Sequence, residues 1–232
     1  AVNRADLLQR AGFYPPPPGA PETLGIEIAG RINSIGDAVT GWSAGDRVCA
    51  IVTGGGYAER CWVHVGSLMR VPQCLSLLEA AAVPEGFLTA FVNLFQEAQL
   101  QPGESVLIHG GASGVGTAAI QLAVASGCRV AVTARDERKL AACRSLGADI
   151  AINHTRQDFS AVIKKTWGGV DVILDIIGAD YVDANLSSLS IRGRMVLIAT
   201  LSGGVATIDL TKMMRNRLRL VGSVLRARSD SE

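Results

Sequence analysis

A glycine-rich segment at residues 106–121, VLIHGGASGVGTAAIQ, restricts the fold of this chain more than any other feature. An apolar run typical of a buried strand leads into the segment, and an Ala-rich stretch with the composition of a helix follows it. Small residues at such a turn allow a tight bend, close approach of the backbone to a pyrophosphate, and tight packing of helix on strand. Aligned with the pattern GxGxxG, the three positions are Gly111, Ser113 and Gly116. No Gly-Lys-Ser/Thr follows, so a Walker-type triphosphate loop is excluded, and we expect a dinucleotide-binding turn rather than a glycine turn without a ligand.

The chain around and after this segment alternates between short apolar runs and helical stretches. Strands that are apolar throughout and joined by helical crossovers form a parallel sheet covered on both faces. The expected strands are residues 105–110, 128–134, 149–154, 170–178, 193–200 and 218–224. The sequence therefore predicts a Rossmann-type, doubly wound α/β domain over residues 99–232.

The first part of the chain has a different pattern. Apolar and β-branched runs at 24–36, 46–54 and 57–65 are separated by turn residues, which predicts an antiparallel barrel or sandwich. The prolines at 15–18 predict an extended surface loop, because proline lacks a backbone donor. Helical spacing begins at Ser76 and is interrupted at Pro84, so we expect two helices that link a first domain, residues 1–98, to the second.

Composition narrows the classes of partner. The 22 basic and 21 acidic residues nearly balance, which predicts no nucleic-acid partner. No apolar run approaches the roughly 20 residues needed to cross a bilayer, so no membrane association is expected. The five cysteines are scattered without CxxC spacing, which favours a reducing cytoplasm over a disulfide framework or zinc cluster.

The end of the second expected nucleotide strand indicates which cofactor binds. An acidic residue there binds the ribose 2′-hydroxyl of NAD, whereas the 2′-phosphate of NADP needs cationic donors. This chain has Thr133 and Ala134 at that position, followed by Arg135 and Arg138. NADPH is therefore the predicted cofactor. The alternative is that the two arginines are solvated charges balanced by the acidic residues at 136–137.

Several stretches together resemble the medium-chain dehydrogenase/reductase superfamily, and within it the quinone oxidoreductase (zeta-crystallin-like) branch. They are NRADLLQRAGFYPPPPGA, LGIEIAG, GDRV, GGGYAE, AAAVPEGFLTAF, HGGASGVGTAAIQ and SLGADIAINH, and they run across essentially the whole chain. The resemblance implies a Rossmann domain plus a partial GroES-like β-barrel domain that carries the substrate site. It also implies that this chain is a fragment lacking both ends, which raises the alternative of an inactive fragment.

The resemblance further implies a set of residues around the cofactor. Asn3 and Tyr14 would line the nicotinamide and substrate side, and they are the candidate catalytic residues. The cofactor-binding set is Asn3, Thr89, Gly111, Ser113, Gly114, Val115, Gly116, Arg135, Arg138, His154, Gly178, Leu201 and Leu225. His109 is expected to form a structural hydrogen bond, His64 to be ordinary surface, and the arginines at 215, 217, 219, 226 and 228 to form a solvated face.

No metal is expected in the site. Zinc-dependent relatives have Cys near the position of Asn3 and a Gly-His-Glu triplet, whereas this chain has Gly25, Ile26 and Glu27, and isoleucine cannot bind zinc. Glu27 is expected to be a structural partner. A quinone is already electrophilic, so its reduction needs little beyond placement against the nicotinamide, by hydride or single-electron transfer.

The predicted function is a zinc-independent NADPH:quinone reductase that forms homo-oligomers, as the resemblance implies. One alternative is an enoyl or alkenal C=C reductase, for which Tyr14 is the obvious proton donor. Another is a non-catalytic NADPH-binding protein that serves as a crystallin or an RNA-binding protein.

Overall fold

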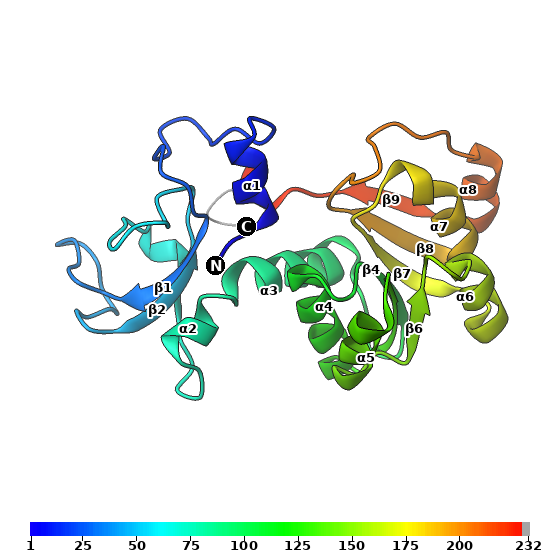
Figure 1. The fold of residues 1–232 in the computed structure, drawn as a ribbon, viewed down its shortest axis with the longest axis horizontal. Coiled ribbons are helices and arrows are strands. Elements are labelled where there is room, and N and C mark those ends of the chain that lie inside the picture. The colour runs from blue at the N-terminus through cyan, green and yellow to red at the C-terminus, as the bar shows by residue number, and fades with distance from the viewer. Residues whose placement is uncertain (229–232) are drawn as a thin grey trace. The chain divides into compact units, whose positions relative to one another are not determined.

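The computed structural model describes residues 1–228, and residues 229–232, at the end of the predicted second domain, lie outside the described part. The described chain divides into two compact units (Figure 1). The first comprises residues 1–88 together with 226–228, and the second comprises residues 89–225.

The first unit is built on an antiparallel sheet in the order β1-β2-β3. The strands are β1 (Glu27–Arg31), β2 (Arg47–Ile51) and β3 (Leu68–Arg70). Its helices are α1 (Arg4–Arg10), a 3-10 helix (Val65–Ser67) and α2 (Leu77–Ala80). Cys49, Val71 and Ala80 form its small buried core.

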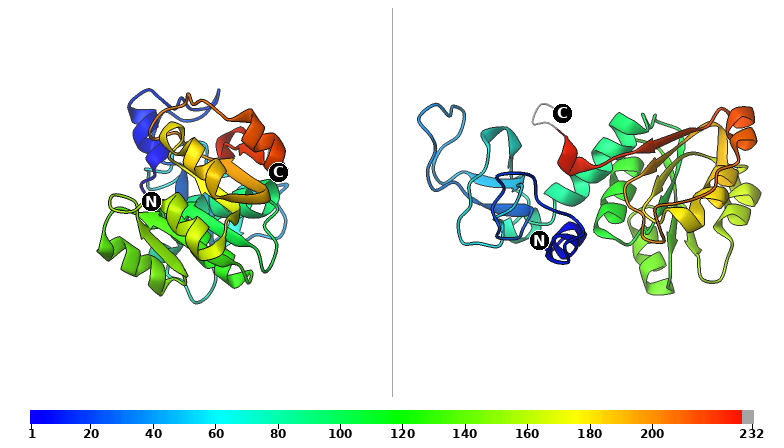
Figure 2. Two further views of the ribbon diagram at one scale, coloured as in Figure 1. Left: turned by 90° about the vertical axis from the view of Figure 1, so that its right-hand side faces the viewer. Right: turned by 90° about the horizontal axis from the view of Figure 1, so that it is seen from above.

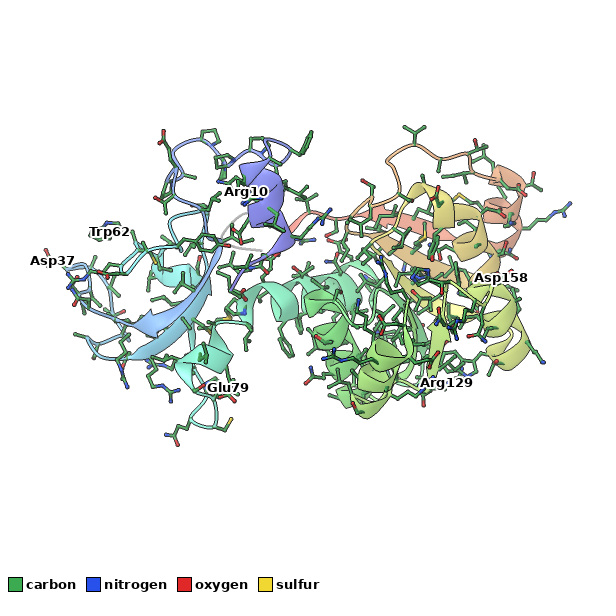
Figure 3. The ribbon with its side chains drawn as sticks, in the orientation of Figure 1. Arg10, Asp37, Trp62, Glu79, Arg129 and Asp158 are labelled. Atoms are coloured by element: carbon green, nitrogen blue, oxygen red, sulfur yellow. The ribbon has the colours of Figure 1, made fainter. Side chains whose placement is uncertain are left out.

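One strand of the predicted set is wrong. Residues 57–65 contain no strand, and the third strand is Leu68–Arg70 instead. The glycines before this segment take backbone angles that turn the chain, with φ of 157° at Gly54 and 81° at Gly55. The Tyr57 hydroxyl then donates to Asp6 Oδ2 at 2.9 Å. These turns and this hydrogen bond replace ladder pairing, and Trp62 projects with 96% of its surface exposed (Figure 3).

The predicted break at Pro84 is confirmed, because α2 ends at Ala80 and the next helix, α3 (Pro84–Phe91), begins at Pro84. A π-helix (Val92–Glu97) continues directly from α3. No helix of the described chain combines the length and apolar character needed to span a bilayer.

The second unit is the predicted doubly wound α/β domain. Its parallel sheet has the order β6-β5-β4-β7-β8-β9, and all six predicted strands are confirmed. The strands are β4 (Ser105–His109), β5 (Arg129–Ala134), β6 (Ile150–Asn153), β7 (Val170–Asp175), β8 (Leu189–Leu197) and β9 (Arg219–Gly222). The helices are α4 (Gly114–Ala125), α5 (Glu137–Ser145), α6 (Phe159–Trp167), α7 (Val182–Ser188) and α8 (Leu210–Asn216), with a 3-10 turn (Ala179–Tyr181) before α7.

The helices cover both faces of this sheet, as the apolar strands require (Figures 1 and 2). Right-handed crossovers place α4 and α5 on one face, and α6, α7 and α8 on the other. The strand order reverses between β4 and β7. Ligands of such sheets bind at the carboxyl ends of the strands beside this reversal, and the glycine-rich segment follows β4 directly.

Candidate cofactor site

The glycine-rich turn is built from residues whose small size the packing requires. Gly110 has φ of 65°, a left-handed conformation that glycine adopts without strain. A Cβ on Gly116 would lie 2.4 Å from the Gly110 carbonyl oxygen and 2.7 Å from that of Gly111. Ser113 precedes α4 and its Oγ accepts from the Gly116 N–H at 3.0 Å, so Ser is a fitting residue at the position where Gly is usual.

The start of α4 leaves room and donors for an anionic group. The backbone N–H groups of Gly114 and Val115 have no hydrogen-bond acceptor among the described residues. A Cβ on Gly114 would meet no atom within 4 Å, so the space beside it is open. Free amides and the positive end of the helix dipole suit a phosphate. This arrangement fits the pyrophosphate of a dinucleotide.

At the end of β5, two arginines follow a neutral residue at the position where NAD-binding proteins have a carboxylate. Thr133 is buried, and Arg135 and Arg138 are exposed without a hydrogen bond or ion pair among the described residues. The acidic neighbours are engaged elsewhere. Asp136 caps α5 and lies 3.8 Å from Lys139 Nζ, and Glu137 lies 3.9 Å from an Arg144 nitrogen. The two arginines are therefore not neutralised by the residues between them.

A chain of buried polar groups connects the carboxyl ends of β4, β5 and β7. His109 Nδ1 lies 3.0 Å from Thr133 Oγ1, and His109 Nε2 lies 2.7 Å from Asn185 Oδ1. The Asn185 amide nitrogen donates to Asp175 Oδ2 at 3.3 Å. The oxygen of Asn185 therefore faces His109, so Nε2 carries the ring proton and Nδ1 accepts from the Thr133 hydroxyl. The predicted structural role of His109 is confirmed.

The surroundings of this chain set its protonation. Burial lowers the pKa of His109 to about 4, so the ring is neutral at pH 7. Burial raises the pKa of Asp175, while the N–H groups of Ile177 and Gly178 and the amide of Asn185 oppose that rise. Sequence reasoning missed Asp175 and Asn185. The position of Asp175 at the end of an apolar strand was the available signal.

Other predicted residues follow the carboxyl ends of the remaining strands. His154 follows β6, Gly178 follows β7, Leu201 follows β8 and Leu225 follows β9. Gly178 has φ of 86° and pairs with Gly203, whereas Leu201 is exposed and Leu225 is half-buried. The parallel sheet thus places all four at the edge that carries the glycine turn.

Thr89 is buried at 8% exposure, and its hydroxyl Oγ1 has no hydrogen-bond partner in the described chain. A buried hydroxyl without a hydrogen-bond partner destabilises the folded protein relative to one that is hydrogen-bonded. Thr89 is therefore suited to receive a polar group from a ligand, which fits its predicted contact with a ribose or nicotinamide.

Asn3 and Tyr14, the two predicted catalytic candidates, belong to the first unit. The Asn3 side-chain amide donates to Glu27 Oε2 at 2.9 Å, and Glu27 Oε1 accepts from the Glu85 N–H at 2.9 Å. Glu27 is therefore the structural partner that the sequence predicts. It holds the orientation of Asn3.

Asp6 is a residue that sequence reasoning missed. It is 1% exposed and accepts from the Asn3 and Gly25 N–H groups and from the Tyr57 hydroxyl. Burial and the bond to Asp6 raise the pKa of Tyr57 to about 12. An acidic residue three positions after Asn3, at the start of a helix, was the signal available in the sequence.

The prediction of a solvated face is wrong for Arg226. Its guanidinium lies 4.1 Å from the centre of the Tyr14 ring, and it donates to the Pro15 carbonyl at 3.2 Å and to Gln9 Oε1 at 3.1 Å. Arg226 and Tyr14 are far apart in sequence, so local pattern could not reveal this contact. Burial raises the pKa of Tyr14 and nearby Arg226 opposes that rise. Of the other four, Arg215, Arg217 and Arg219 are exposed as predicted, whereas Arg228 is half-buried.

The donor set of the described residues does not fit a zinc ion. No group of three His, Cys, Asp or Glu side chains in the described range could hold a metal. Both carboxylate oxygens of Glu27 already accept hydrogen bonds, and His64 is exposed and caps a 3-10 helix.

Two family descriptions match the chain. Residues 1–73 match "Alcohol dehydrogenase GroES-like domain" and residues 114–232 match "Zinc-binding dehydrogenase". The chain is 33% identical over its full length to quinone oxidoreductase of Mus musculus and covers 71% of that protein. It is 32% identical over 95% of its length to a quinone oxidoreductase-like protein 2 homolog of Nematostella vectensis, of which it spans 61%.

Solved structures show the same likeness. The Escherichia coli quinone oxidoreductase complexed with NADPH superposes with a TM-score of 0.85 at 30% identity, over 97% of this chain and 70% of that one. The CurK enoyl reductase superposes with a TM-score of 0.77 at 33% identity, over 88% of this chain and 61% of that one.

Proposed function

We propose that this chain, which belongs to the medium-chain dehydrogenase/reductase superfamily, is a zinc-independent oxidoreductase that reduces quinones with NADPH. Its similarity to quinone oxidoreductases over its whole length supports this reaction class. The observation that carries the choice of NADPH is the end of β5, where neutral Thr133 replaces a carboxylate and Arg135 and Arg138 are exposed without partners among the described residues.

The residues of the second unit would hold the cofactor. The free amides of Gly114 and Val115 would bind the pyrophosphate, and the guanidinium groups of Arg135 and Arg138 would bind the 2′-phosphate. Thr89 would donate to a ribose or nicotinamide oxygen. Bound NADPH supplies the reducing equivalents, as a hydride or as single electrons.

The residues of the first unit would act on the substrate side. The bond from the Asn3 amide nitrogen to Glu27 Oε2 fixes the orientation of the Asn3 side chain. The contact of Arg226 with Tyr14 holds the phenol, which like any tyrosine is protonated at neutral pH and able to donate. A quinone needs only such positioning and protonation, which is consistent with a donor set that does not fit zinc.

The choice of NADPH is tested by replacing both arginines in the full-length protein. We expect wild type to bind NADPH at least about tenfold more tightly than NADH, because each charge-assisted contact with the 2′-phosphate adds affinity. Arg135→Ala/Arg138→Ala should weaken NADPH binding roughly 100-fold, to the level of NADH, with NADH binding unchanged. Fluorescence titration with both nucleotides measures this.

Lys139→Ala is the matched control, because Lys139 is an exposed cation of the same helix that is already paired with Asp136. Its NADPH affinity should stay within about twofold of wild type, since surface pairs of this kind contribute little. If wild type binds the two nucleotides equally, the arginines are solvated charges and the proposal of NADPH is wrong.

An enoyl or alkenal reductase is the second candidate, because the likeness to the CurK enoyl reductase is comparable in identity and Tyr14 supplies a protonated donor. Rates with ortho-quinones and with trans-2-alkenals, measured with the same NADPH, separate the two. Tight NADPH binding with neither substrate turned over would instead favour a non-catalytic role. The scattered free cysteines support our further proposal of a cytoplasmic protein, and the family resemblance supports a homo-oligomer.

A further inference from the structure

Three arginine side chains of the second unit line one surface depression of about 470 Å³. Arg192 lies within β8, Arg217 caps the carboxyl end of α8, and Arg219 begins β9. No carboxylate is among the residues that line the depression. Residues far apart in sequence therefore bring three positive charges to one place.

The backbone at two of these arginines is strained. Arg192 has φ of 65° and Arg217 has φ of 53°, in the left-handed region that favours glycine. Of the described non-glycine residues, only one other, Gln99, shares this conformation. Backbone strain at a residue that contributes to a pocket is a recognised sign of function. Here two of the three lining residues carry it.

Two other arginines on strands of the same sheet have partners, whereas these three do not. Arg194 is buried, with its guanidinium 2.7 Å from Glu104 Oε2, and Arg129 stacks over the Trp167 ring at 4.7 Å. Arg192, Arg217 and Arg219 form no hydrogen bond, ion pair or ring contact within residues 1–228. Three unneutralised guanidinium groups repel one another, and a bound anion would remove that repulsion.

We propose that this arginine pocket, lined by Arg192, Arg217 and Arg219, binds a small polyphosphate anion. Guanidinium forks match phosphate oxygens through paired hydrogen bonds, and a volume of about 470 Å³ accommodates a chain of two or three phosphates. The pocket lies at the amino-terminal edge of the sheet, since β9 begins at Arg219, whereas the glycine turn follows the carboxyl end of β4. It is therefore separate from the proposed cofactor site, and does not depend on it.

Isothermal titration of the full-length protein with inorganic tripolyphosphate tests the proposal. We expect saturable binding in 50 mM NaCl that weakens in 300 mM NaCl, because exposed charge pairs are screened by salt. Arg219→Ala and Arg217→Gly should each weaken binding by about tenfold or more. Arg217→Gly should also keep or raise the melting temperature, because glycine relieves the left-handed strain.

Two matched variants identify the site. Arg215→Ala removes an exposed cation of α8 that does not line the pocket, and should bind like wild type. Arg135→Ala/Arg138→Ala should also retain binding. Loss of binding in the latter variant alone would place the anion at the proposed cofactor site and overturn the proposal. Absence of binding to wild type, or binding of single-stranded RNA but not of tripolyphosphate, would overturn it as well.

Discussion

Replacement of Gly116 by alanine should reduce NADPH affinity by at least about 100-fold and lower the free energy of unfolding by about 2 kcal/mol. The added Cβ would lie 2.4 Å and 2.7 Å from two backbone carbonyl oxygens, neither of which can rotate away as a side chain could. The turn must therefore open, which moves the free amides of Gly114 and Val115 out of position. Fluorescence titration with NADPH and urea denaturation measure the two effects.

Gly114→Ala is the matched control for this substitution. Its Cβ would meet no protein atom within 4 Å, so the free energy of unfolding should hold or rise slightly. NADPH affinity should nevertheless fall, because the methyl group would occupy space that we assign to the pyrophosphate. Normal NADPH binding by Gly114→Ala would refute that assignment, and normal binding by Gly116→Ala would refute the described geometry of the turn.

Replacement of Asn185 by leucine should lower the free energy of unfolding by about 3 kcal/mol at pH 7. Leucine has the same branched arrangement of side-chain heavy atoms but no polar atoms, so the ring N–H of His109 loses its acceptor and Asp175 loses a donor. All three residues are at most 1% exposed, so water cannot substitute for the lost groups.

Urea denaturation of Asn185→Leu and of Asn33→Leu provides the comparison. Asn33 is exposed, and the same chemical change there should alter the free energy of unfolding by no more than about 0.5 kcal/mol. Equal changes in the free energy of unfolding of the two variants would mean that the hydrogen bonds of the buried polar chain do not stabilise the fold.

The same buried chain predicts a dependence of stability on pH. Burial lowers the pKa of His109 from 6.5 to about 4, so between these values the unfolded chain binds the proton and the folded one does not. The stability from neutral His109 is complete above pH 6.5 and is lost as pH falls toward 4, by about 2 kcal/mol at pH 5. Buried Asp175, with its raised pKa, acts in the opposite sense and reduces the net loss.

His109→Gln isolates the histidine contribution, because glutamine does not titrate. The loss of unfolding free energy between pH 7.5 and pH 5.0 should be smaller in His109→Gln than in wild type. Denaturation curves at the two pH values give both differences. Identical differences would show that His109 does not carry this pH dependence.

Several features of the candidate site were open to prediction because their signals are local. The glycine turn is one short stretch of sequence, and the neutral end of β5 with the two arginines after it is another. The polar chain of His109, Asn185 and Asp175 was not open to prediction, since Asn185 lies 76 residues from His109. The contact of Arg226 with Tyr14 and the arginine pocket likewise join residues from separate elements.

The sequence by itself determined the six parallel strands and the turn that follows the first of them. Apolar runs and small residues specify these through the chain's own conformational preferences and the need to bury both faces of the sheet. Only the tertiary structure decided that residues 57–65 leave the small sheet, and that Asp6 and Glu27 hold their partners. Those outcomes depend on which distant groups satisfy buried donors and acceptors, and that choice is made only when the chain is folded.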